Sequence, residues 1–175
     1  MPLNDQDHFE IDRYQYYLKP GYIFFSKEPT LIYTVMGSAV TVCLWDREKR
    51  VGGVSHFIYP EISEKKKATA QYGNVAVLTL IKLMITDGSD KSSLEAQLFG
   101  GGDPVSLAED TIGKQNVSMA KRILNQQGIP ITSEDVGGSK GRKLAYKSDT
   151  NEAIVLKVDR LRQEDWPPYI LPADR

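Results

Sequence analysis

The order of apolar and polar residues along the chain predicts several short strands and two helices. From Val40 to Trp45 the residues are apolar or β-branched at odd and even positions alike, which is typical of a strand buried on both faces. The charged run 46–50 predicts an exposed hairpin turn, and residues 51–59 predict the strand that returns from it. Further strands are expected at residues 22–25, 31–35, 94–99, 129–133, 144–147 and 153–158.

Two longer segments have the spacing of helices that pack on a sheet. Residues 69–86 are too apolar for a surface helix, and Gly88 follows where a helix commonly ends. Residues 113–127 carry apolar side chains on one face and are followed by Gly128. Because strands outnumber helices and hairpins join most of them, we expect an α+β sandwich: a mixed, mostly antiparallel β-sheet core with two main helices packed on it.

The composition is that of one domain with one buried core. The chain has 175 residues, 41% of them hydrophobic, and neither a linker nor an internal repeat divides it. We therefore expect a single domain over residues 1–175, with an N-terminal arm at 1–19 lying over it. The proline-rich tail at 159–175 is expected to pack as an extended strap rather than to fold as a unit.

Charge and cysteine content exclude several classes of function. With 22 basic and 23 acidic residues the net charge is −1, so neither nucleic acid nor an anionic membrane is an expected partner. No segment approaches the roughly 20 apolar residues of a membrane span, and the N-terminus lacks the features of a secretory signal, so we expect a cytoplasmic protein without membrane insertion. One cysteine and two histidines, with no CxxC or HExxH pattern, predict neither a metal site nor a cofactor.

The candidate chemistry lies between residues 34 and 56. A tight turn at Gly37 and Ser38 presents a small residue at position 39, and the strand that returns from the hairpin brings His56 beside it. This geometry suits a nucleophile and its base, but the residue at the nucleophile's place is Ala39. Taken alone, His56 could equally be a structural histidine.

The other reactive or glycine-rich features favour structural roles. Cys43 lies in a strongly apolar strand and is expected to be a buried thiol with a raised pKa. The loops 100–103 and 135–143 match neither phosphate-binding glycine pattern, so we interpret them as turns in which backbones approach closely. Three basic residues of the second loop could contact an acidic partner, although a solvated loop is the more common outcome; they are Lys140, Arg142 and Lys143.

A series of motifs runs in one unbroken order from approximately residue 20 to residue 158. The longest are Thr34-Val-Met-Gly-Ser-Ala-Val-Thr-Val-Cys-Leu-Trp-Asp46 and Val51-Gly-Gly-Val-Ser-His-Phe57. Shorter ones are residues 70–74, 94–101, 112–116, 128–131 and 134–143. Together they closely resemble the CheD family of chemoreceptor glutamine deamidases.

The resemblance implies a reaction and the residues that carry it. In that family a cysteine in a Gly-Ser-Cys turn attacks the side-chain amide of a receptor glutamine, and water then hydrolyses the thioester to leave glutamate. Ala39 matches the position of that cysteine, His56 matches the histidine that activates the thiol, and Thr34 matches the threonine that orients the histidine. Substrate or oxyanion contacts are expected at Gly37, Ser38 and Ser55.

The resemblance also implies a fold and partners. The fold is a three-layer sandwich akin to that of bacterial toxin deamidases that use cysteine and histidine. The expected partners are the cytoplasmic domains of methyl-accepting chemoreceptors, with a CheC-type phosphatase as a second partner.

Two residues depart from the family pattern. Ala39 has no group that can form a thioester, and loss of a covalent nucleophile typically lowers turnover on the order of a million-fold, so the chain as written is expected to be inactive. Ser55 stands where many relatives have asparagine. Either the alanine replaces a native cysteine, as the retained His56 and Thr34 favour, or the chain is a natural pseudoenzyme that serves as a receptor- or CheC-binding adaptor.

Overall fold

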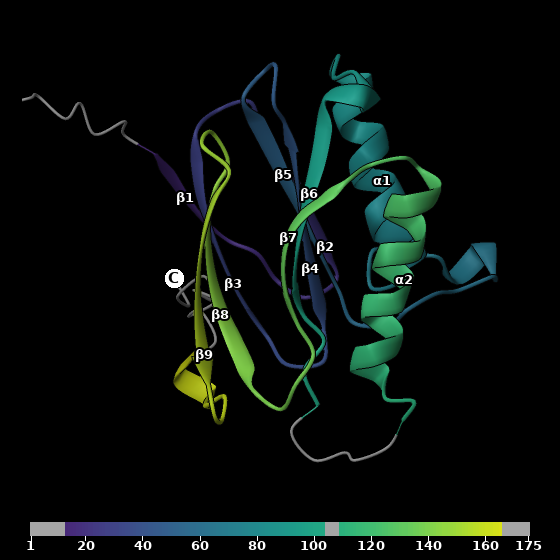
Figure 1. Ribbon diagram of the computed structural model, residues 1–175, viewed down its shortest axis with the longest axis vertical. Coiled ribbons are helices and arrows are strands. Elements are labelled where there is room, and N and C mark those ends of the chain that lie inside the picture. Colours follow the sequence, from purple (N-terminus) through teal and green to yellow (C-terminus); the bar gives the residue numbers. More distant parts are fainter. Residues whose placement is uncertain (1–12, 104–108, 166–175) are drawn as a thin grey trace, which may run out of the picture.

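The computed structural model describes residues 13–103 and 109–165, and these residues form three layers (Figure 1). The strands are β1 (Tyr14–Tyr17), β2 (Tyr22–Phe25), β3 (Thr30–Met36), β4 (Val40–Asp46), β5 (Val51–Phe57), β6 (Leu94–Gly100), β7 (Ile131–Val136), β8 (Gly141–Lys147) and β9 (Glu152–Val158). The helices are α1 (Gly73–Thr86) and α2 (Ile112–Gln126), with 3-10 turns at Lys65–Lys67, Lys91–Ser93 and Gln163–Asp165.

The layers are a sheet, a second sheet and a pair of helices. One sheet has the strand order β1-β3-β8-β9, and the other has the order β2-β5-β4-β6-β7. Both helices pack on the five-stranded sheet, on the side away from the four-stranded one (Figure 1). The β1–β3 and β6–β7 pairs are parallel and the remaining neighbours are antiparallel. The expected α+β sandwich, with a mixed and mostly antiparallel core and two main helices, is confirmed.

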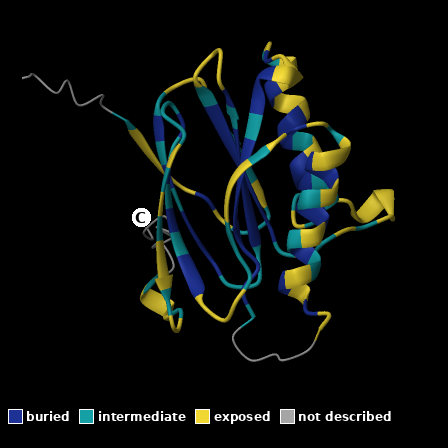
Figure 2. Ribbon diagram, viewed as in Figure 1, coloured by how far each residue is buried: buried dark blue, intermediate teal, exposed yellow. Residues whose placement is uncertain are grey.

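Strand β4 runs through the centre of the molecule and is buried on both faces. Val40, Val42 and Leu44 pack against the helices in one apolar cluster. Cys43 points the other way, into a second cluster that fills the space between the two sheets. Figure 2 shows the same result, since the buried residues are most continuous on the strands of the middle layer. Odd and even positions of β4 are therefore both apolar because each face of the strand packs against an apolar cluster.

Helix α1 begins at Gly73, four residues later than expected. Before it, Tyr72 is extended and forms a β-bridge with Tyr59, so the chain runs beside the end of β5 before it turns into the helix. A side chain at position 73 would lie 2.7 Å from the ring of Phe57. Glycine at this position therefore lets the first turn of the helix approach the sheet closely.

The glycine-rich loop expected at 135–143 is shorter than predicted. Strand β7 continues to Val136 and β8 starts at Gly141. Arg142 lies within β8 and is 2% exposed, so the expectation of a solvated side chain is wrong for this residue. Its guanidinium forms an ion pair at 3.0 Å with Asp135 and donates to the carbonyl of Gly137 at 2.8 Å. A buried charge needs partners of this kind, and here the end of β7 and the loop that follows it supply them.

Both ends of the described chain pack on the four-stranded sheet. Residues 14–17 of the expected arm form the edge strand β1, which pairs with β3. In the expected strap, the Leu161 side chain occupies the space beside Gly141, and Lys143 pairs with Asp165. Residues 1–12 and 166–175 lie outside the described residues.

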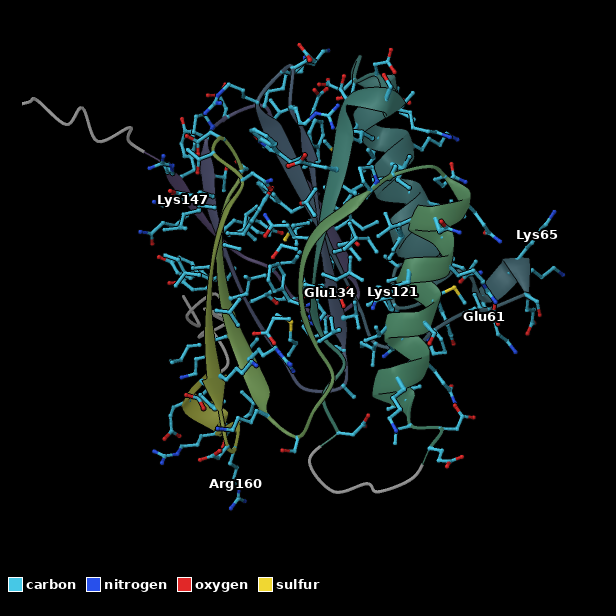
Figure 3. The ribbon with its side chains drawn as sticks, in the orientation of Figure 1. Glu61, Lys65, Lys121, Glu134, Lys147 and Arg160 are labelled. Carbon is cyan, nitrogen blue, oxygen red and sulfur yellow. The ribbon has the colours of Figure 1, made fainter. Side chains whose placement is uncertain are left out.

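Ion pairs at the surface link neighbouring elements. Lys121 of α2 and Glu134 of β7 point toward one another, with 3.0 Å between Nζ and Oε1 (Figure 3). Arg122 pairs with Glu61 in the loop before α1. Exposed pairs typically contribute about 0–1 kcal/mol, so the two apolar clusters dominate the stability of the fold. None of the helices within the described ranges is long and apolar enough to cross a membrane.

Candidate active site

His56 and Thr34 meet in the layer between the two sheets. His56 lies on β5 of the five-stranded sheet and Thr34 on β3 of the four-stranded sheet, and both are buried. The Nδ1 atom of His56 lies 2.6 Å from the Thr34 hydroxyl oxygen. The predicted histidine and threonine are therefore brought together by the packing of the sheets, although 22 positions separate them.

The hydrogen bonds of Thr34 fix which imidazole nitrogen carries the proton. The threonine hydroxyl donates to the carbonyl of Leu18 at 3.0 Å. A hydroxyl has a single proton, so toward His56 its oxygen acts as an acceptor and Nδ1–H is the donor. Nε2 is then left with a lone pair, and it has no hydrogen-bond partner among the described residues. This tautomer is the one required of a base that acts through Nε2.

The surroundings of His56 keep the ring neutral. Burial lowers the pKa of His56 from its ordinary value of 6.5 to about 4. Thr41, the residue directly opposite on β4, places its hydroxyl 3.4 Å from Nδ1 and donates to the sulfur of Met36. No acidic group pairs with the ring in the part of the chain that the structure describes, so at neutral pH nothing offsets the cost of burying a charged imidazole and His56 stays neutral.

Ala39 lies on the same side of its sheet as His56. It immediately precedes β4, and its side chain packs against the cluster between the sheets. Ala39 is two positions before Thr41, the cross-strand partner of His56. Diagonal neighbours of this kind have Cα atoms about 7–8 Å apart, a separation that two side chains pointing toward each other can span.

The turn before β4 is fixed through its carbonyl groups. Gly102 N–H donates to Gly37 O, and Gly101 N–H donates to Ala39 O, each at 2.9 Å. Asn116 of α2 donates to the third carbonyl, that of Ser38, also at 2.9 Å. Three consecutive carbonyls are thus held by groups from the loop after β6 and from α2. The turn is a rigid platform for whatever side chain stands at position 39.

Ser55 and Cys43 are not brought to this site. A side chain on Gly53, two positions before Ser55, would meet Leu80 of α1. Because strand residues alternate between faces, Ser55 also points toward the helices, whereas His56 points toward the other sheet. Cys43 does face the sheet interface, but it lies two residues further along β4 than Thr41, and burial raises its pKa well above the ordinary value.

Sequence reasoning missed Leu18 and Asn116. The Leu18 contribution is a backbone carbonyl, which no residue pattern reveals. Asn116 did carry a signal, because it is a polar residue at the helical spacing of Met119, Ala120 and Ile123, the buried face of α2. A fully buried asparagine on an apolar helix face needs hydrogen-bond partners, and those partners are the carbonyls beside the candidate site.

Known proteins share most of this chain. The family model for CheD chemotactic sensory transduction matches residues 59–157. A probable chemoreceptor glutamine deamidase CheD 1 of Anaeromyxobacter dehalogenans is 40% identical over 148 residues, which are 83% of this chain and 86% of the relative. The chain belongs to the CheD family.

More distant CheD relatives cover the chain to a similar extent. A probable chemoreceptor glutamine deamidase CheD of Sulfurimonas denitrificans is 32% identical over 82% of this chain and 94% of its own length. A probable chemoreceptor glutamine deamidase CheD 2 of Geobacter sulfurreducens is 30% identical over 82% of this chain and 90% of its own. Any continuous stretch that covers 82% of a 175-residue chain includes residues 34–56, so these likenesses extend over the candidate site.

The CheD family model itself begins after the candidate site. Its match starts at Tyr59, just beyond His56, and includes Asn116 and the glycine-rich loop after β6, which donates to the turn. The described part of the chain contains no group of three or more histidine, cysteine or acidic side chains that could hold a metal ion. The reactive groups that the site offers are thus an imidazole, hydroxyls and backbone amides.

Proposed function

We propose that the chain is a chemoreceptor glutamine deamidase whose nucleophile position is occupied by alanine. The observation that carries this proposal is the unpartnered Nε2 of His56, held in the basic tautomer by Thr34 on the face that also bears Ala39. The names of the CheD relatives, which are probable chemoreceptor glutamine deamidases, support the choice of substrate. The substrate is then a glutamine in the cytoplasmic domain of a chemoreceptor, and the reaction takes place in the cytoplasm.

With cysteine at position 39, the first half of the reaction forms a thioester. The thiol proton passes to His56 Nε2 while the sulfur bonds to the glutamine amide carbon, and the amide oxygen takes the negative charge. Backbone N–H groups of the turn at residues 37–39 stabilise that oxyanion. The intermediate collapses when the carbon–nitrogen bond breaks, and the amide nitrogen leaves as ammonia with the proton from His56.

The second half hydrolyses the thioester. A water molecule gives a proton to Nε2 and bonds to the acyl carbon, and the carbon–sulfur bond then breaks to release glutamate and the thiolate. The thiolate recovers its proton from the imidazolium. Throughout the cycle Thr34 accepts the hydrogen bond of Nδ1–H and so keeps Nε2 directed at the reacting atoms.

The chain as written stops before the first step. Ala39 has no thiol, and Cys43 cannot replace it because its sulfur lies further along β4 and burial raises its pKa. We therefore expect binding of receptor glutamine without hydrolysis.

The decisive experiment restores the sulfur. The Ala39→Cys variant should release ammonia from a chemoreceptor cytoplasmic fragment and raise the mass of one glutamine peptide by about 1 Da, as expected for an amide replaced by an acid. The double variant with His56→Ala should lose this activity, and the unmodified chain is the negative control. If the Ala39→Cys variant folds correctly with an intact His56 and no receptor fragment is deamidated, the proposal is wrong.

A second candidate is a non-catalytic adaptor, and Ala39 itself favours it. The alanine packs against the cluster between the sheets, so the fold tolerates the loss of the sulfur. An adaptor would bind a chemoreceptor or a CheC-type phosphatase and would not need His56 or Thr34. Two measurements separate the two candidates. In a pull-down with a chemoreceptor fragment or a CheC-type phosphatase, the His56→Ala variant of an adaptor retains its binding. In the deamidation assay, the Ala39→Cys variant of an adaptor gains no deamidase activity.

A further inference from the structure

Asn116 connects the turn at residue 39 to the strand that carries His56. It lies on α2 with 0% of its surface exposed. Its amide nitrogen donates to Ser38 O at 2.9 Å and to Ile58 O at 2.8 Å. Ser38 immediately precedes Ala39, and Ile58 follows His56 by two residues. One side chain thus fixes both halves of the candidate site relative to each other.

The hydrogen bond to Ser38 also sets the direction of the next amide. The peptide between Ser38 and Ala39 is trans, because the described residues contain no cis peptide bond. In a trans peptide the carbonyl and the following N–H point in opposite directions. Asn116 draws the Ser38 carbonyl toward the helix layer, so the Ala39 N–H points away from α2, toward the side of the sheet on which His56 lies.

That N–H is available to a ligand. None of the described residues accepts a hydrogen bond from it, whereas the carbonyl of the same residue is bonded to Gly101. Among the described residues, Asn116 is the one group that donates to the Ser38 carbonyl, whereas Gly102 and Gly101 hold the carbonyls on either side of it. The direction of the residue 39 N–H is therefore set by the Asn116 side chain, which belongs to the helix layer.

We propose that Asn116 is a positioning residue that directs the N–H of residue 39 at the oxyanion formed during glutamine deamidation. This inference rests on the proposed function and deepens it, since it names the group that prepares the oxyanion site. Asn116 acts only through the Ser38–Ala39 peptide and does not touch the substrate.

The chemistry of the side chain explains why it is an asparagine. Both amide hydrogens are used, while Oδ1 is buried without a partner among the described residues. An aspartate has the same shape, but it only accepts hydrogen bonds when ionised and donates only one when protonated, so it cannot donate to both carbonyls. The Asn116→Asp variant is thus a minimal change that removes the hold on the peptide.

The test uses the Ala39→Cys variant as its starting point and adds Asn116→Asp. The matched control is Asn125→Asp, the same replacement at an exposed position of the same helix. The measurements are kcat and KM for deamidation of a receptor fragment, and the rate at which iodoacetamide alkylates the cysteine introduced at position 39, with Cys43 distinguished by peptide mapping. Alkylation needs the thiolate but forms no oxyanion, so it reports on the sulfur and His56 alone.

We expect Asn116→Asp to lower kcat about 100-fold, with KM and the alkylation rate at position 39 changed less than about threefold. Asn125→Asp should leave all three unchanged. If Asn116→Asp fails to fold, Asn116→Thr, which can donate to only one carbonyl, serves in its place and should lower kcat by a smaller factor.

The failures of the two proposals are distinguishable. An Ala39→Cys parent that is alkylated but never deamidates a receptor overturns the proposed function, and the inference with it. A parent that is active while Asn116→Asp retains full kcat overturns the inference alone. Equal losses in kcat and in alkylation would mean that Asn116 only maintains the local fold, which also overturns a role in directing the oxyanion donor.

Discussion

The hydroxyl of Thr34 and the imidazole of His56 meet across two different sheets, at 2.6 Å. Neither residue is a hydrogen-bonded strand neighbour of the other, because β3 belongs to the four-stranded sheet and β5 to the five-stranded one. The tautomer of His56 is thereby set from outside its own sheet, through a threonine that Leu18 in turn orients.

This arrangement predicts the effect of removing the hydroxyl. In the Ala39→Cys background, Thr34→Val should lower kcat for deamidation by roughly 10–100-fold, because Nδ1–H loses its acceptor and the basic tautomer is no longer favoured. Thr34→Ser keeps the hydroxyl and should restore most of the rate. Thr132→Val, on the edge strand β7, is the matched control. Full activity in Thr34→Val would contradict the assigned tautomer.

The burial of His56 predicts how stability depends on pH. Its pKa is about 4 in the folded protein against 6.5 ordinarily, so between these values the unfolded chain binds a proton that the folded chain does not. The free energy of unfolding should therefore rise with pH across this window and fall by on the order of 3 kcal/mol as the pH drops from 7 to below 4.

Urea denaturation at a series of pH values measures this dependence. The His56→Gln variant is the comparison, and its unfolding free energy should change less between about pH 6.5 and about pH 4 than that of the unmodified chain. Parallel curves for the two proteins would show that His56 does not remain neutral in the folded state.

Much of this architecture follows from the sequence because apolar periodicity reports directly on burial. The doubly covered strand β4 is predictable from a run of apolar residues at both parities, and the pairing of His56 with Thr34 follows from the family resemblance. The buried state of Arg142 could not be predicted, because its partners are an aspartate and two backbone carbonyls whose positions depend on how β7 ends and β8 begins. The hydrogen bond from Asn116 to the Ser38 carbonyl could likewise not be predicted, because it joins a helix and a turn that are 78 positions apart in the sequence.

Gly100 is required for the turn at residue 39. Its φ is +106°, and a side chain at this position would collide with the carbonyl of Ala39. Gly128 also has a positive φ, of +69°, but nothing lies within 4 Å of the place where its side chain would be. Gly128→Ala should therefore cost about 1 kcal/mol from backbone strain alone, whereas Gly100→Ala should cost more than about 2 kcal/mol.

Thermal or chemical unfolding of the two alanine variants measures the difference. In the Ala39→Cys background, Gly100→Ala should also abolish deamidation, since the displaced carbonyl belongs to the residue that carries the nucleophile. Equal destabilisation by the two substitutions would contradict the close approach of Gly100 to Ala39.

Cys43 should be chemically silent in the folded protein. It is 0% exposed and burial raises its pKa far above the ordinary value of 9.0, so almost no thiolate is present at neutral pH. We expect Cys43 in the unmodified chain to react with a thiol reagent more than about 100-fold faster in denaturant than in native buffer. In the Ala39→Cys variant one thiol should react readily and the other should not. Rapid labelling of native Cys43 would contradict its burial.

The helices cover only one of the two sheets, and the reactive geometry is divided between both. A fluctuation that separates β3 from β5 would disconnect Thr34 from His56 while α1 and α2 remain packed on their own sheet. Partial opening of this kind requires less free energy than global unfolding, so low concentrations of denaturant should silence an active Ala39→Cys variant before helical circular dichroism changes. The activity of the Ala39→Cys variant would then depend on contact between the two sheets, and intact secondary structure alone would not be enough for it.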